Sequence, residues 1–191
     1  MSGRHLSEPD GTDDGTVGSL DPVGTLGSVE RVDEDWRISF VRDYGHPVDA
    51  VWSMLTDPAL TRLWWADARI EPGVGGRFDL RWLNSPEAGA WWPGAVTVWQ
   101  PPHVLEFTNS EHGLLRWELR ATDAGTRLRF IDLIRPAEER FVAMSLAGWH
   151  LHLDHLAEAL DGTGQDWDAW LERWLPTWQE RHAEYAARVV R

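Results

Sequence analysis

Hydrophobic and polar residues alternate along several segments of the chain, which predicts strands that are buried on one face. The clearest segment is 35–44 (DWRISFVRDY), in which Trp36, Ile38 and Phe40 recur at every second position. A weaker alternation at 24–31 predicts an edge strand. Further strands, separated by turn residues, are predicted at 68–71, 77–83, 91–100, 103–108, 114–120 and 126–134. Consecutive strands joined by tight turns indicate an antiparallel meander.

Apolar residues at helical spacing predict two short helices among these strands and two longer helices after them. His46-Pro47 and Asp57-Pro58 each place a proline at the first position of a short helix. A long helix is predicted over 137–161, closed by Gly162, with an apolar stripe formed by Val142, Trp149, Leu153, Leu156 and Leu160. A last helix, at about 166–189, carries an aromatic face formed by Trp167, Trp170, Trp174 and Trp178. We expect this face to pack on the domain, since exposed tryptophans would promote aggregation.

This order of elements predicts an α+β fold of the helix-grip kind. In such a fold, a curved antiparallel sheet wraps around a long C-terminal helix, here with an extra terminal helix. We assign 24–162 to the helix-grip domain and 163–191 to a helical extension that packs on it. Residues 1–23 are rich in Gly, Asp and Ser and nearly lack large apolar side chains, so they are predicted to be a disordered acidic tail.

Composition removes several classes of function. The 191 residues include no cysteine, which excludes a disulfide scaffold and thiolate chemistry, and no lysine, which excludes a Schiff base. The net charge of −13 disfavours binding to nucleic acid or to an anionic membrane. No signal peptide or membrane-spanning stretch is found, so we expect a cytoplasmic protein that is a monomer or a weak homodimer. The 14 tryptophans indicate an aromatic core, an aromatic pocket or both.

Several segments resemble the activator of heat shock protein 90 ATPase homologue-like family, which belongs to the START-like (SRPBCC, Bet v 1-like) superfamily. The matching segments are HPVDAVWSMLTDPALTRLWW (46–65), GVGGRF (73–78), PPHVLEFT (101–108), GTRLRF (125–130) and GWHLHLDHLAEALDG (148–162). The resemblance covers roughly 24–162 and implies the helix-grip fold. It says less about function, because this fold hosts ligand binders, cyclases, lipid carriers and co-chaperone domains.

In such folds the concave sheet face and the long helix can enclose a pocket. We therefore predict that the chain binds a small, mostly apolar ligand in an aromatic-lined cavity. Alternation and helical spacing point ten residues towards it: Trp65, Phe78, Leu80, Trp82, Trp117, Phe130, Asp132, Met144, Trp149 and His152. The alternative is that these side chains fill a solid core.

The polar candidates have plainer interpretations. A buried Asp132 would have a raised pKa and could act as a base, but we expect it at the frayed end of its strand, solvated or paired with an arginine. His152 and His155 have a spacing that can bind a metal ion. We expect them, with His150, to be solvated or to pack between helices, although His152 could present a donor to a ligand. We predict no metal, no cofactor and no catalytic residue.

Two other functions remain open at this point. The first is a co-chaperone-like interaction module that stimulates a chaperone ATPase, which only the family resemblance suggests. The second is a cyclase-like or hydratase-like enzyme that uses Asp132 or His152.

Overall fold

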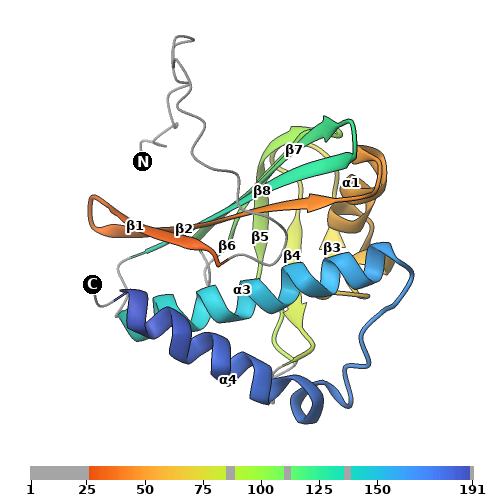
Figure 1. The fold of residues 1–191 in the computed structure, drawn as a ribbon. Helices are drawn as coiled ribbons and strands as arrows, with labels where there is room; N and C mark the ends of the chain where they lie inside the picture. Colours follow the sequence, from red (N-terminus) through yellow and green to blue (C-terminus); the bar gives the residue numbers. More distant parts are fainter. Residues whose placement is uncertain (1–25, 85–88, 110–112, 136–138, 190–191) are drawn as a thin grey trace.

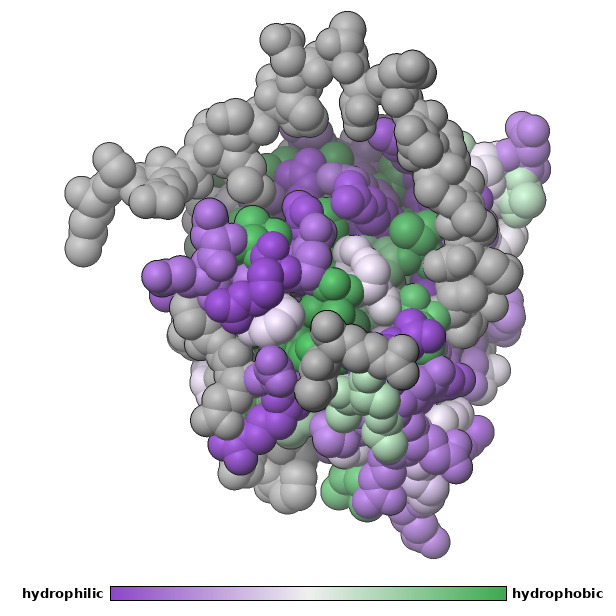
Figure 2. All heavy atoms as spheres, turned by 60° about the vertical axis from the view of Figure 1, so that its left-hand side comes forward, coloured by the Kyte–Doolittle hydropathy of each residue, from purple (hydrophilic) through white to green (hydrophobic). Residues whose placement is uncertain are grey.

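A computed structural model describes residues 26–84, 89–109, 113–135 and 139–189. The predicted acidic tail lies outside these residues. A curved sheet lies over one long helix, and a second helix runs beside the long helix on the side away from the sheet (Figure 1). Seen from the side where β1 and the end of α4 lie, hydrophobic residues gather in the middle of the face among hydrophilic ones (Figure 2).

The main sheet has six antiparallel strands in the order β1-β2-β8-β7-β6-β5. Their bounds are β1 Ser28–Val32, β2 Asp35–Tyr44, β5 Gly94–Gln100, β6 Val104–Asn109, β7 Gly113–Thr122 and β8 Gly125–Ile134. Strands β5 to β8 form the predicted meander. Strand β2 pairs with β8 along its length from Trp36 to Tyr44, and every second residue of β2 is buried. The earliest long strand is thereby held against the last one.

The hairpin of β3 (Ala66–Ile70) and β4 (Phe78–Trp82) departs from a single meander, because it forms a two-stranded sheet of its own. Two isolated bridges, Arg77 to Ala95 and Leu80 to Trp92, join it to the region of β5. The backbones approach closely at Gly94, where an added Cβ would lie 2.4 Å from the carbonyl oxygen of Phe78. Only glycine fits this junction.

Two short helices, α1 (Val48–Thr56) and α2 (Pro58–Thr61), precede the hairpin. Asp57 ends α1 and caps α2, since its carboxylate accepts the N–H of Ala59 at 2.8 Å. Helix α3 (Glu139–Leu160) then crosses the inner face of the main sheet. Its predicted stripe packs on the core, with Leu160 less buried than the other four residues.

Helix α4 (Trp170–Val189) runs antiparallel to α3 and is held by side-chain hydrogen bonds. The indole N–H of Trp170 donates to Nε2 of His155 at 3.1 Å. Further along, the Tyr185 hydroxyl lies 2.8 Å from Nδ1 of His150 and accepts the backbone N–H of Gly27 at 2.8 Å. The last helix is therefore anchored to α3 and to the segment before β1.

This architecture confirms the predicted α+β helix-grip fold with an extra terminal helix. Among the described helices, none combines the length and the apolar character needed to cross a membrane.

Candidate ligand-binding pocket

A cluster of aromatic side chains fills most of the space between the sheet and α3. Trp117 and Phe130, paired across β7 and β8, have ring centroids 4.2 Å apart, and Phe130 lies 4.3 Å from Trp149 of α3. Trp65 closes the cluster at 5.4 Å from Trp149. The rings of Trp65, Trp117 and Phe130 are completely buried. This part of the predicted cavity is a packed core.

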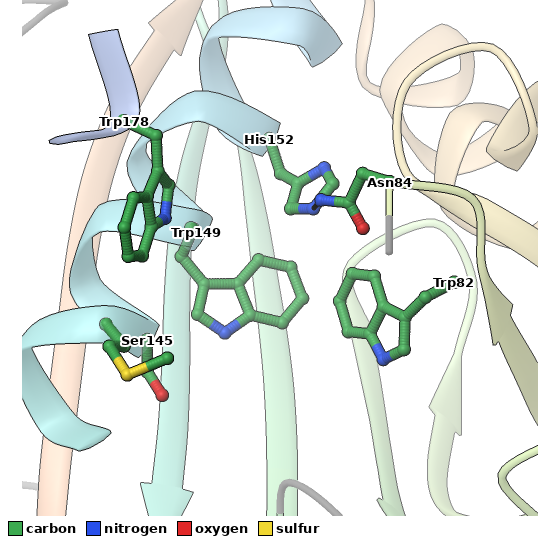
Figure 3. A pocket seen from close by; sticks show the side chains of 8 residues that line it. Trp82, Asn84, Ser145, Trp149, His152 and Trp178 are labelled. Atoms are coloured by element: carbon green, nitrogen blue, oxygen red, sulfur yellow. Dashed lines mark hydrogen bonds between the residues drawn. The ribbon is translucent and has the colours of Figure 1, made fainter. Parts of the chain in front are cut away.

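A pocket of about 270 Å³ opens beside that core, between β4, α3 and α4 (Figure 3). It is lined by Trp82, Asn84, Met144, Ser145, Gly148, Trp149, His152 and Trp178. The indoles of Trp82 and Trp149 have centroids 6.3 Å apart, at 66° to one another. Trp178 comes from α4 and stacks on His182 at 5.1 Å. Three indoles from three elements thus form the walls.

Four of the ten predicted ligand-binding residues line this pocket, namely Trp82, Met144, Trp149 and His152. Met144 is 42 % exposed. The other six lie in the packed core beneath, where each is at most 1 % exposed: Trp65, Phe78, Leu80, Trp117, Phe130 and Asp132. The ten residues therefore divide between a packed core and the lining of a smaller pocket.

His152 is the polar group best fixed in the pocket wall. Its Nδ1 lies 3.1 Å from the carbonyl oxygen of Trp64, which can only accept, so Nδ1 carries the proton. Nε2 is then a lone-pair acceptor, and it lies 3.4 Å from Nδ2 of Asn84. Burial lowers the pKa of His152 to about 4, which keeps the ring neutral. The expectation that His152 presents a donor is thus corrected, since Nε2 accepts.

Asp132 does not lie at a frayed strand end, and no arginine pairs with it among the described residues. It is fully buried, because β8 continues past it to Ile134 and is covered on both sides by β2 and β7. Oδ2 accepts the indole N–H of Trp149 at 3.0 Å, and Oδ1 has no hydrogen-bond partner in the described part of the chain. Burial raises the pKa of Asp132 to about 8. Trp149 thus bonds to Asp132 on one side and lines the pocket on the other.

The two remaining histidines of α3 pack between helices, in agreement with the expectation. Trp170 donates to Nε2 of His155, and the Tyr185 hydroxyl, which receives the Gly27 N–H, donates to Nδ1 of His150. Burial lowers the pKa of each ring to about 3. No cluster of potential metal ligands occurs among the residues described. These histidines hold α4 in place.

Sequence reasoning missed four of the lining residues: Asn84, Ser145, Gly148 and Trp178. The helical spacing predicts that Trp178 packs on the domain with Trp170 and Trp174, whereas in the structure Trp178 lines the pocket. Ser145, Gly148 and His152 share the spacing i, i+3, i+7, which is a signal for one helix face. Nothing in the sequence distinguishes that face as the lining of a pocket.

Solved structures with the same fold come from several bacteria. The crystal structure of CalU16 from Micromonospora echinospora has a TM-score of 0.66 and 23 % identity, and covers 85 % of this chain and 95 % of that one. A conserved protein of unknown function, EF2215 from Enterococcus faecalis, has a TM-score of 0.68 and 16 % identity, with 86 % and 90 % coverage. At these identities the likeness shows the fold alone. No curated protein matches the chain in sequence.

A family profile, described as Activator of Hsp90 ATPase homolog 1-like protein, matches residues 45–161. The match begins just before α1 and ends just after α3, so it spans the hairpin, the meander and the long helix. It covers more than half of the chain and agrees with the fold of the solved structures. The chain therefore belongs to the Activator of Hsp90 ATPase homolog 1-like family.

Proposed function

We propose that this protein binds a small, mostly apolar ligand in the pocket between β4, α3 and α4. The observation that carries the proposal is the lining, in which three indoles surround a few fixed polar groups. Ligand sites typically combine apolar walls with a small number of placed polar atoms. The volume of 270 Å³ is near the lower end for such sites, so the ligand is a small molecule.

Gly148 offers a way to block the pocket without disturbing the core. A Cβ added there meets no atom within 4 Å, so a larger side chain has room to enter the pocket. We expect Gly148→Leu to fill the pocket and to weaken ligand binding at least tenfold. The helix itself should gain up to about 1 kcal/mol, because glycine is a poor helix former. Gly148→Ala is the matched control, since it makes the same backbone change but adds a single methyl group.

The measurement is native mass spectrometry of each variant purified from its source, with the mass of a co-purified small molecule as the readout. The wild type and Gly148→Ala should retain the bound mass, and Gly148→Leu should lose it. Retention of the same mass by a folded Gly148→Leu variant would place the ligand elsewhere.

The two alternative functions have less support. The family name refers to activation of a chaperone ATPase, and an ATPase assay with purified chaperone tests that function directly. An enzyme that uses Asp132 would first have to move Trp149, which covers the carboxyl group with its own hydrogen bond. Ligand binding requires neither a partner protein nor such a movement.

A further inference from the structure

The proposed pocket has an unusual polar character, because its fixed side-chain acceptor is a neutral imidazole. The Trp64 carbonyl binds the Nδ1 proton of His152 and so directs a lone pair from Nε2. In Figure 3 the His152 ring and the Asn84 amide face one another beside the indoles of Trp82 and Trp149. The contact between Nε2 and Nδ2 of Asn84, at 3.4 Å, is longer than an ordinary hydrogen bond. A better donor would therefore improve the environment of Nε2.

The lining also restricts the charge of the ligand. Its eight residues include no aspartate, glutamate or arginine. A ligand carboxylate would face the lone pair of Nε2 without a cation to balance its charge. Moving the carboxylate from water into such a site would cost free energy of desolvation. An uncharged ligand meets no such penalty.

The shape of the walls favours a flat ring system. The rings of Trp82 and Trp149 both lie within 6 Å of the His152 ring, at 5.3 and 5.9 Å between centroids. Trp178 adds a third indole from α4. Aromatic rings pack well in offset or edge-to-face contacts with such walls. The pocket volume equals that of roughly nine water molecules, which limits the ligand to a small ring system.

Building on the proposed function, we infer that the pocket selects an uncharged planar aromatic molecule that carries one O–H or N–H group, and that Nε2 of His152 accepts this donor. The indoles supply contact area, and His152 supplies the discrimination between a hydroxylated compound and its methyl ether. Asn84 gives up its weak contact to His152 when the ligand arrives.

Three matched compounds test this inference: 2-naphthol, its methyl ether and 2-naphthoate. They share one ring system and differ in the donor and in charge. We expect 2-naphthol to bind about tenfold more tightly than the ether, the change that one net hydrogen bond produces. The naphthoate anion should bind more weakly than either. Affinities come from titrations followed by protein NMR.

The variant His152→Asn distinguishes the role of Nε2 from that of Nδ1. An asparagine amide can reproduce the bond from Nδ1 to the Trp64 carbonyl but does not reach the position of Nε2. We expect this variant to remain folded and to bind 2-naphthol and its methyl ether with similar affinity, so that the preference for 2-naphthol is lost. A ¹⁵N-labelled wild-type sample gives a second readout that needs no substitution, because the Nε2 resonance of His152 should move with 2-naphthol and stay in place with the ether.

The outcomes distinguish the two proposals. If both neutral compounds bind equally, or if His152→Asn keeps the preference, the role of His152 is wrong and the apolar pocket stands. If neither neutral compound binds, the pocket proposal fails for flat aromatic ligands, and the inference about His152 fails with it.

Discussion

Trp117 and Trp178 show two uses of the same side chain in one small domain. Trp117 lies on the inner face of the sheet, fully buried, with Phe130 at 4.2 Å and Trp149 at 5.7 Å. Trp178 lies on α4, stacks on His182 and lines the pocket. A ring enclosed by protein contributes to stability, whereas a ring that lines a pocket remains available to a ligand. These two tryptophans therefore belong to different parts of the molecule, the packed core and the pocket lining.

The largest expected effect comes from removing the enclosed ring. We predict that Trp117→Ala lowers the free energy of unfolding by about 3–5 kcal/mol, because it leaves a large cavity in the core. Trp178→Ala should cost much less, since its ring is only partly enclosed. Urea denaturation of both variants measures the difference, and equal losses would contradict the division between core and pocket.

The contact between α3 and α4 should be sensitive to acid. Burial lowers the pKa of His155 to about 3 in the folded state, whereas the pKa in the unfolded state is near 6.5. The contribution of His155 to stability is therefore fully present at a pH above about 6.5. That contribution is lost as the pH falls from about 6.5 towards 3, by up to about tenfold in the folding equilibrium per pH unit.

The variant His155→Gln tests this acid sensitivity. Its amide oxygen can accept the Trp170 N–H in place of Nε2 but does not titrate. We predict a shallower decline of the melting temperature below pH 6.5 than in the wild type. An unchanged pH profile would show that His155 is not buried as neutral imidazole in solution.

Between pH 6.5 and 8, Asp132 should give a pH dependence of opposite sign, which is smaller than that of His155 because this pH range is narrower. Its folded pKa is raised to about 8, so its contribution is fully present below the unfolded value near 4 and declines as the pH rises towards 8. In the unfolded state the α3 histidines are half protonated near pH 6.5, but the wild type and a variant at Asp132 share them, so their titration cancels when the two are compared.

Asp132→Asn is the matched variant, because an amide oxygen can still accept the Trp149 N–H. We predict that the melting temperature of this variant changes less between pH 6.5 and 8 than that of the wild type. A wild-type profile that is already flat over this range would mean that Asp132 is ionised at neutral pH.

Local patterns predicted the fold well but the pocket poorly. Alternation along β2 and the helix start at Asp57-Pro58 depend on neighbouring residues, and both appear in the structure as expected. Burial of Asp132 depends instead on the pairing of β2 and β7 with β8, which no local pattern reports. The role of Trp178 depends on how far α4 extends along α3. Contacts between distant segments decide both cases.

The bond between Gly27 and Tyr185 spans 158 residues and has a consequence for synthesis on the ribosome. The segment before β1 is made early, yet its N–H partner emerges only when nearly the whole of α4 has been translated. Until then Nδ1 of His150 also lacks the hydroxyl that it contacts in the finished protein. The nascent chain can form its sheet in advance, but the segment before β1 can join α4 only after Tyr185 has been translated.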